Sequence, residues 1–302
     1  MKEITEILHA VSALADGEKA ILATVIDVQG SGYRLPGARM LMLADGKTYG
    51  TVSGGCLEAD VLDRAKKVLA TGNSEVFTYD TTENEDSVFS LNMGCRGVIE
   101  ILLERVDKNS SLISKMRSAY EDRRFFEEVE PPITILLFGA GADAVPLVRI
   151  ASELGWPVTV HDHRPAYLTE ERFPEAERLV AQTSDEPLGE IASDTRTAAV
   201  IMTHNYTRDR LILPVLLRSN VFYIGALGPK RRTEQLLEEI AQAGDLFTPE
   251  QLARLYAPVG LDIGADTPEG IALSIIAEIQ SVLKNRNGGH LRYREGSIYD
   301  RK

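Results

Sequence analysis

A glycine-rich turn near the middle of the chain has the spacing of a phosphate-binding loop. Gly139, Gly141 and Ala144 fit the pattern G-x-G-x-x-A directly after the apolar run 133–138. In such a turn the small residues permit a tight bend, close approach of a diphosphate to the backbone, and close packing of helix on strand. Free N–H groups at the start of the following helix would bind the anion. The spacing predicts a diphosphate site, with a turn kept only for packing as the alternative.

Two residues downstream could act on a ligand held by this turn. Asp162 lies about 20 residues further on, at the end of the next predicted strand, where an acid binds ribose hydroxyls in dinucleotide-binding domains. A capping role for Asp162 is the alternative. His204, in the loop 203–206, is a candidate general base or ligand, and a hydrogen-bonded surface histidine would have the same sequence context.

A second glycine-bearing loop, 225–232, follows another predicted strand. It contains Gly225, Gly228 and Lys230, with two arginines after the lysine. Glycines and cations at the carboxyl end of a strand suit a phosphate or another anion. A helix that begins with a solvated basic face would look the same in sequence, so both interpretations stay open.

The elements that would position these residues alternate between strand and helix in the second half of the chain. Strands are predicted at 133–138, 157–161, 198–203 and 221–224, with segments long enough for crossover helices between them. A final helix is predicted after Thr267 as cap, with Pro268 at its first position. This alternation indicates an α/β fold, with a Rossmann-like, doubly wound parallel sheet over residues 133–302.

The hydrophobic patterns in the first half of the chain predict an α+β domain over residues 1–106. An opening amphipathic helix is followed by strands predicted at 20–28, 39–43, 48–52, 75–79 and 98–103. Asp45-Gly46 is a strong hairpin turn, and a helix is predicted from Leu57. Residues 107–132 are strongly charged and end in two prolines, which predicts a linker with a solvated helix across 112–126.

Composition limits the classes of partner and compartment. The 302 residues are 44% hydrophobic and 26% charged, with a net charge of −12, so a nucleic-acid partner is not expected. The sequence has no apolar run of the length that a membrane span needs, and its start lacks the features of a signal peptide. Two cysteines do not make a secreted disulfide framework, which favours the cytoplasm.

Longer segments resemble one family, the XdhC/CoxI-type accessory proteins of xanthine dehydrogenase and related molybdenum hydroxylases. In the first half the resemblance rests on motifs around Gly30, Ser53 and Gly94-Cys95. In the second half it rests on LLFGAGADAVPLVRIASELGWPVTVHDHRP, MTHNYTRD, FYIGALGPKRR and APVGLDIGADTPEGIALSIIAEI. Two cysteines cannot supply the iron–sulfur ligands of the dehydrogenase itself, and the chain is too short for a molybdenum-plus-flavin enzyme. A maturation factor is therefore expected.

The resemblance implies a function and a set of contacts. Proteins of this kind bind the molybdenum cofactor, support its sulfuration by a cysteine desulfurase-type sulfurase, deliver it to xanthine dehydrogenase apoprotein, and form homodimers. The implied cofactor contacts in the first domain are Gly30, Ser31, Arg34, Gly37, Ser53, Gly54, Gly55, Cys56, Glu58 and Cys95. In the second domain they are Gly139, Gly141, Ala144, Asp162, Gly225, Gly228 and Lys230, a site that could equally hold NAD(P) or another nucleotide.

The two cysteines suit this function because thiolates are soft ligands able to engage molybdenum or its sulfur chemistry. Cys95 and Cys56 are therefore the candidate metal contacts, and small buried packing residues are the alternative. Arg34 could clamp a phosphate, and Glu58 could serve only the helix dipole. Two other functions stay open: an NAD(P)-dependent oxidoreductase with His204 or Cys95 as catalytic candidates, and a module that tethers a sulfurase to the dehydrogenase.

Overall fold

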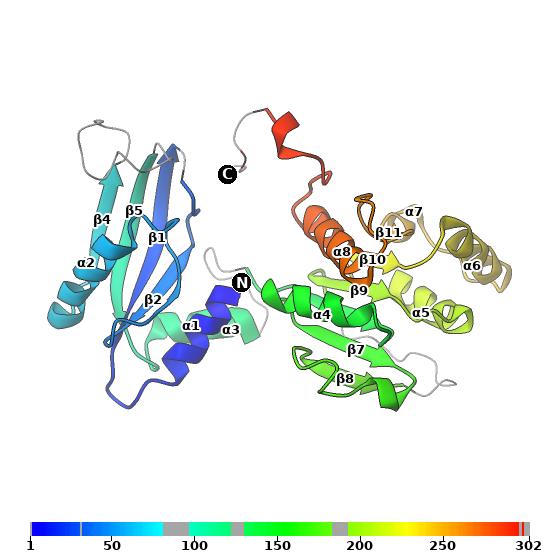
Figure 1. Ribbon diagram of the computed structural model, residues 1–302, viewed down its shortest axis with the longest axis horizontal. Coiled ribbons are helices and arrows are strands. Elements are labelled where there is room, and N and C mark those ends of the chain that lie inside the picture. Colours follow the sequence, from blue (N-terminus) through cyan, green and yellow to red (C-terminus); the bar gives the residue numbers. More distant parts are fainter. Residues whose placement is uncertain are drawn as a thin grey trace. The chain divides into compact units, whose positions relative to one another are not determined.

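The chain folds into two compact units, Met1–Pro132 and Ile133–Lys302 (Figure 1). The structure is a computed structural model, and it describes residues 2–30, 32–80, 97–121, 130–182, 193–295 and 298. The first unit contains an antiparallel sheet and the second a parallel one, flanked by helices. The predicted α/β class is therefore confirmed.

The sheet of the first unit has the strand order β3-β2-β1-β5-β4, and all its strand pairs are antiparallel. Its hairpin between β2 and β3 turns at Gly46, whose φ is +89°, as the Asp45-Gly46 pair predicts. The strands are β1 (Ala20–Gly30), β2 (Arg39–Leu43), β3 (Thr48–Gly50), β4 (Glu75–Asp80) and β5 (Gly97–Val106).

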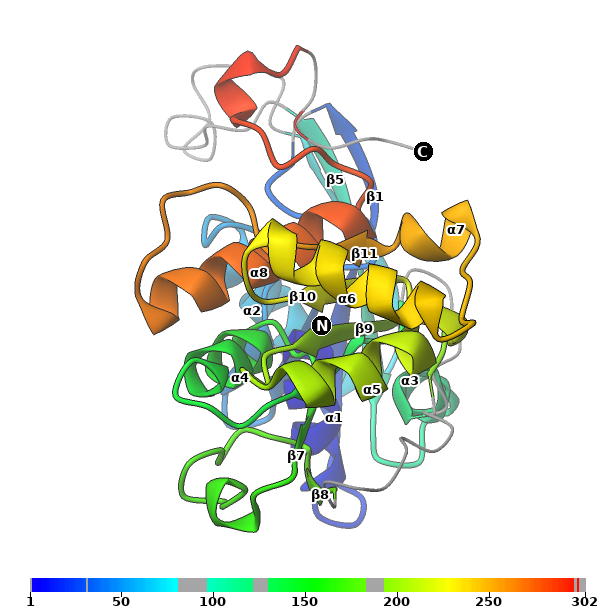
Figure 2. The same ribbon diagram turned by 90° about the vertical axis from the view of Figure 1, so that its right-hand side faces the viewer.

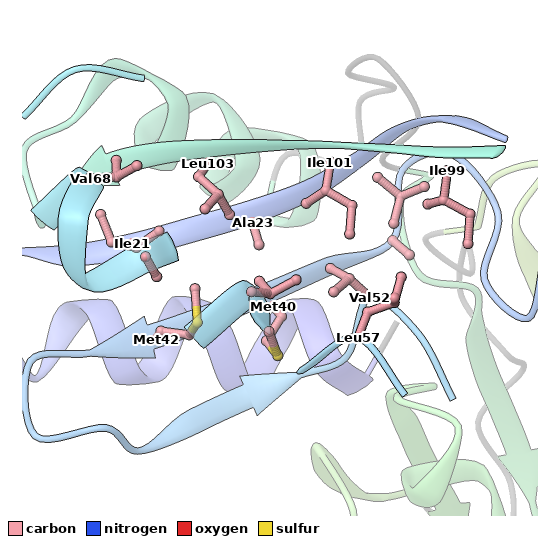
Figure 3. Packing of buried hydrophobic residues seen from close by; sticks show 14 residues of the cluster. Ile21, Ala23, Met40, Met42, Val52, Leu57, Val68, Ile99, Ile101 and Leu103 are labelled. Carbon is pink, nitrogen blue, oxygen red and sulfur yellow. The ribbon is translucent and has the colours of Figure 1, made fainter. Parts of the chain in front are cut away.

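Both faces of this sheet are buried, because side chains that alternate along β1 enter two separate cores. Ala20 and Leu22 pack with α1 (Lys2–Ser12) and α3 (Ser111–Glu121) on one face. Ile21 and Ala23 pack on the other face, against α2 (Glu58–Thr71), in the cluster drawn in Figure 3. Each large apolar side chain buried in this way stabilises the fold by roughly 1.5–3 kcal/mol. This packing fixes the position of α2, and with it the turn that precedes the helix.

The helix expected within the charged segment 107–132 differs from the prediction. Instead of being solvated, α3 buries Ile113, Met116 and Ala119 in the same core as α1. Its polar residues mask this apolar stripe in the sequence, and only packing against the sheet reveals it. This part of the segment belongs to the first unit.

The sheet of the second unit has the strand order β11-β10-β9-β6-β7-β8, with every pair parallel. In order of appearance this is the 3-2-1-4-5-6 arrangement of the dinucleotide-binding fold, whose ligands bind where the strand order reverses. That point lies at the carboxyl ends of β6 and β9. The strands are β6 (Thr134–Phe138), β7 (Val158–Asp162), β8 (Arg178–Ala181), β9 (Thr197–Ile201), β10 (Tyr223–Ala226) and β11 (Leu255–Tyr256).

Helices cover this sheet on both faces: α4 contacts α8, and α5 contacts α6 (Figure 2). The last long helix begins as predicted, with the Thr267 side chain accepting a hydrogen bond from Gly270 N at 3.1 Å and Pro268 at its first position. The helices are α4 (Ala144–Glu153), α5 (Tyr206–Arg218), α6 (Lys230–Gln242), the short α7 (Pro249–Leu252) and α8 (Pro268–Leu283).

Two strands of this sheet were missing from the prediction. β8 is four residues long and only half-buried, and β11 has two residues. Both lie at the edges of the sheet, where a strand needs neither a long apolar run nor a strict alternation. Among the described helices, none has both the length and the hydropathy of a membrane span.

Candidate functional site

The Gly139–Ala144 turn lies at the switch point, and its first glycine is required by packing. Gly139 has φ +119°, and a Cβ there would lie 2.2 Å from the carbonyl oxygen of Met202. The register explains this contact, because Phe138 pairs with Ile201 and Met202 N donates to Phe138 O at 2.7 Å. Ala144 is fully buried at the start of α4. The packing role is thus present in the fold, beside any role in binding.

Asp162 holds this turn from the neighbouring strand. Its side chain is 2% exposed, and its Oδ2 accepts hydrogen bonds from Ala140 N at 2.7 Å and from Arg164 Nη2 at 2.9 Å. Its Oδ1 accepts from the backbone N and the Nε of Arg164, at 2.8 and 2.9 Å. Burial by itself would raise the pKa of Asp162, but these hydrogen bonds outweigh it and lower the pKa to about 2. The carboxylate is therefore ionised and bound within the protein.

An aspartate–histidine pair lies over the turn. His204 Nε2 is 2.7 Å from Asp143 Oδ2, and the His204 side chain is 62% exposed. His204 has φ +54°, a conformation that non-glycine residues adopt rarely and that marks a position worth testing for function. A Cβ added at Gly141 would lie 2.6 Å from Asp143 Oδ1, so this glycine makes room for the aspartate. The sequence singled out His204 but did not identify its partner.

The predicted anion loop at 225–232 is arranged differently from the expectation. Gly225 is a buried residue of β10, and a Cβ there would lie 2.4 Å from Val259 Cγ2, so its missing side chain serves packing. Gly228 has φ +129° and lies next to the side chain of Arg232. Arg232 donates to Asp209 at 2.7 Å, and Lys230 is 3.8 Å from Glu234. These two cations therefore have carboxylate partners of their own.

Sequence reasoning missed a cluster of two arginines and a tyrosine after β7. The guanidinium carbon of Arg164 lies 4.0 Å from the centre of the Tyr167 ring, and that of Arg172 lies 4.9 Å from it. Arg172 also reaches the turn itself, with Nη2 3.4 Å from Gly141 O. We call Arg164, Tyr167 and Arg172 the arginine rim. The only signal in the sequence was an arginine two positions after Asp162.

The space behind the turn is too small for a ligand. A cavity of about 10 Å³ lies between the strand ends, next to Gly139, His161 and Arg208. This volume accommodates at most one water molecule. Burial and the charge of Arg178 lower the pKa of His161 to about 4, so the imidazole is neutral at pH 7. A ligand that the glycine turn holds would therefore lie over the turn, outside this cavity.

In the first unit, Glu58 organises the Ser53–Cys56 turn. Its Oε1 accepts hydrogen bonds from Thr51 Oγ1 at 2.6 Å and from Ser53 N at 2.9 Å, and its Oε2 accepts from the Ser53 hydroxyl. The Ser53 hydroxyl oxygen in turn accepts from Gly55 N and Leu57 N. Burial would raise the pKa of Glu58, but the hydrogen bonds from Ser53 and Thr51 lower it. Glu58 thus acts through this network as well as at the helix start.

The turn presents Cys56 on the surface of the first unit. Cys56 is exposed and its thiol lies 3.7 Å from Ser53 Oγ, so the buried packing role does not apply to it. Gly55 has φ +104° and open space around it. The ring of Tyr33, from the loop 30–37, packs on Gly54, which places the two glycine loops side by side.

The remaining predicted contacts of the first unit have partners within the unit or fall outside the described residues. Arg34 forms an ion pair with Glu3 of α1. Gly37 N donates to Val25 O at 2.8 Å, and Gly30 ends β1 with φ +78°. Ser31 and Cys95 lie outside the described residues. Within the part of the chain that the structure describes, no three His, Cys, Asp or Glu side chains gather as a metal site would require.

We expect Glu58→Ala to loosen the Ser53–Cys56 turn without unfolding the first unit. The variant removes the acceptor of three hydrogen bonds, which costs roughly 1–3 kcal/mol of local stability. Amide hydrogen exchange at Gly55 and Leu57 should rise by about tenfold or more. Asp63→Ala is the matched control on the same helix, because Asp63 forms an ion pair that is 75% exposed on both sides. Equal exchange in the two variants would contradict the bracing role of Glu58.

The two units define a two-domain α/β protein whose second domain has the dinucleotide-binding topology. The model of the XdhC and CoxI family matches residues 13–80, and the model of the XdhC Rossmann domain matches residues 135–279. A protein of Bacillus subtilis, described as a probable subunit of xanthine dehydrogenase, is 32% identical, over 88% of this chain and 94% of the relative. The chain therefore belongs to the XdhC and CoxI family, as its motifs predicted.

Two further relatives extend this similarity. The molybdenum cofactor insertion chaperone PaoD of Escherichia coli is 25% identical, over 92% of this chain and 88% of PaoD. The crystal structure of a Bacillus halodurans protein described as a xanthine dehydrogenase has a TM-score of 0.80 and 29% identity, and covers 98% of each chain. Both units thus have counterparts in a solved structure.

Proposed function

We propose that this protein binds the molybdenum cofactor, supports its sulfuration, and inserts it into a xanthine dehydrogenase-type apoenzyme in the cytoplasm. The observation that carries the proposal is the exposed Cys56 thiol on a turn braced by Glu58, beside the open backbone of Gly55. Two of the relatives support it, because their names refer to molybdenum cofactor insertion and to xanthine dehydrogenase. The partners would be the apoenzyme and a cysteine desulfurase-type sulfurase, with the chain acting as a homodimer.

The residues of the turn have separable tasks in this proposal. Cys56 supplies a soft thiolate that can engage molybdenum or its sulfur ligands. The Gly54–Gly55 backbone leaves room for an anionic ligand to approach the start of α2, where peptide dipoles favour negative charge. Cys95 and Ser31, which the resemblance also implies as contacts, are part of the same proposal.

The experiment is retention of cofactor released from a molybdoenzyme, measured as molybdenum that co-elutes with the purified full-length protein. Wild type should retain it, and Cys56→Ser and Cys95→Ser should each retain less, with the double variant the least. Arg218→Gln is the control, because Arg218 pairs with Asp245 on the surface of the second unit. Failure of the wild type to retain molybdenum or to activate the apoenzyme would contradict the proposal, as would full retention by the double cysteine variant.

A second candidate, an NAD(P)-dependent oxidoreductase, is favoured by the pairing of His204 with Asp143 at 2.7 Å over the glycine turn. In this function His204 would transfer a proton while the nicotinamide accepts or donates a hydride. The test is turnover of NADH or NADPH with a panel of carbonyl substrates, by wild type and His204→Ala. If the protein bound NADH or NADPH without turnover, the nucleotide would be a ligand of a cofactor-insertion protein, and the oxidoreductase function would be contradicted.

A further inference from the structure

The arginine rim places two guanidinium groups beside the Gly139–Ala144 turn. Arg164 donates to Asp162, whose Oδ2 also accepts from Ala140 N of the turn. Arg172 Nη1 donates to Tyr167 O at 2.7 Å, and its guanidinium carbon lies 5.3 Å from the centre of the buried Phe173 ring. The Asp162 carboxylate and the Tyr167 ring fix the Arg164 guanidinium, and carbonyl groups and aromatic rings fix that of Arg172.

The two guanidinium groups at this edge differ in their partners. Asp162 is paired with Arg164, and Asp143 is paired with His204. The hydrogen bonds of the Arg172 guanidinium go to the carbonyl oxygens of Tyr167 and Gly141, and in the described part of the chain no carboxylate is in ion-pair contact with it. A guanidinium group stays charged at any physiological pH. Arg172 therefore offers a fixed positive charge to whatever lies over the turn.

The same geometry leaves Asp162 without a free acceptor for the hydroxyl groups of an unmodified ribose. An ionised carboxylate has about four lone-pair sites. At Asp162 these already receive Ala140 N and three donors of Arg164, and the side chain is 2% exposed. In dinucleotide-binding domains a free acid at this position binds the ribose hydroxyls, and an arginine nearby accommodates a phosphate on the ribose. In this unit the acid is occupied, and Arg164 and Arg172 lie near it and near the turn.

We infer that the arginine rim, Arg164, Tyr167 and Arg172, binds the phosphate monoester of a ligand held over the glycine turn. The phosphate monoester could be the 2′-phosphate of a dinucleotide or the phosphate of the pterin cofactor, and it carries close to two negative charges at pH 7. The inference rests on the proposed function, because it states which part of the ligand the second unit holds. The Tyr167 ring packs against both guanidinium groups. Arg172 provides a planar guanidinium group, whose geometry matches phosphate oxygens.

Calorimetric titration of the full chain with NADP⁺, with NAD⁺ and with released cofactor tests this inference. Wild type should bind the phosphate-bearing ligand, and in the dinucleotide case NADP⁺ should bind at least about tenfold more tightly than NAD⁺. Arg172→Gln should weaken binding of the phosphate-bearing ligand by about tenfold, and Arg172→Lys by less, because it keeps the charge but loses the planar guanidinium group. Arg218→Gln is the matched control, since Arg218 also lies over an aromatic ring, that of Phe247.

The outcomes separate the two sources of phosphate. A loss confined to NADP⁺ identifies the dinucleotide, and a loss confined to the cofactor identifies the pterin phosphate. Fluorescence of Trp156, the single tryptophan, shows that each variant is folded. Equal affinities of Arg172→Gln and wild type for both ligands, or no binding of either by wild type, would overturn the inference. Apoenzyme activation that survives such a result would leave the proposed function standing.

Discussion

Gly139→Ala is expected to destabilise the second unit by roughly 3–5 kcal/mol, enough to unfold it in part of the population at 37 °C. A Cβ at this position would lie 2.2 Å from Met202 O and 3.0 Å from Thr203 N, both backbone atoms of a buried strand end. The φ of +119° adds a strain of about 1–2 kcal/mol for any residue with a side chain. Neither cost can be relieved by moving a flexible side chain. The measurement is urea unfolding followed by the fluorescence of Trp156, which is buried in this unit.

Gly244→Ala separates the collision from the backbone strain. Gly244 has φ +96°, in the same unit, but nothing lies within 4 Å of the position of its Cβ. This variant should lose only about 1 kcal/mol, the cost of an alanine with positive φ. If both variants lost the same free energy, the close approach of the turn to β9 would be irrelevant to stability, and a role in ligand binding would be the better reason for Gly139.

Asp162→Asn is expected to lower the free energy of unfolding at pH 7 by about 3 kcal/mol. The variant removes a buried negative charge and leaves the Arg164 guanidinium and the Ala140 N–H with weaker or missing acceptors. Unfolding is again followed by Trp156 fluorescence. Asp245→Asn is the control, because the pair Arg218–Asp245 is 51% and 44% exposed and should contribute no more than about 1 kcal/mol. A loss as small as that of the control would contradict the bracing role of Asp162.

The ion pair of Asp162 with Arg164 makes the stability of the second unit depend on pH. The pKa of Asp162 is lowered in the folded protein from 3.8 to about 2. A lowered carboxyl pKa adds stability that is fully present above the unfolded value and is lost as the pH falls through the folded value. Between pH 5 and pH 2 the wild type should therefore lose about 2 kcal/mol more than Asp162→Asn. Parallel pH profiles of the two proteins would show that Asp162 titrates normally.

The patterns of the sequence determined the class of fold and most of its elements, because local propensity and hydrophobic period are properties of neighbouring residues. The hairpin at Asp45-Gly46 and the cap at Thr267 were predicted for this reason. The apolar stripe of α3 and the edge strands β8 and β11 were missed, because only contacts with distant residues stabilise them. The family was likewise identified from motifs in the sequence and is confirmed by its relatives.

The tertiary structure alone decided what the individual site residues contact. The sequence singled out Gly139, Asp162 and His204 by position. The parallel register of β6 and β7 places Asp162 beside the turn, where it accepts a hydrogen bond from Ala140 N. The register of β6 and β9 places His204 within hydrogen-bond distance of Asp143. The tertiary structure also shows that Gly225 packs closely against Val259 and that Arg172 lies beside Gly141. Spacing along a chain specifies which residues follow a strand, whereas the contacts of Asp162 with Ala140, of His204 with Asp143 and of Arg172 with Gly141 join segments far apart in the sequence.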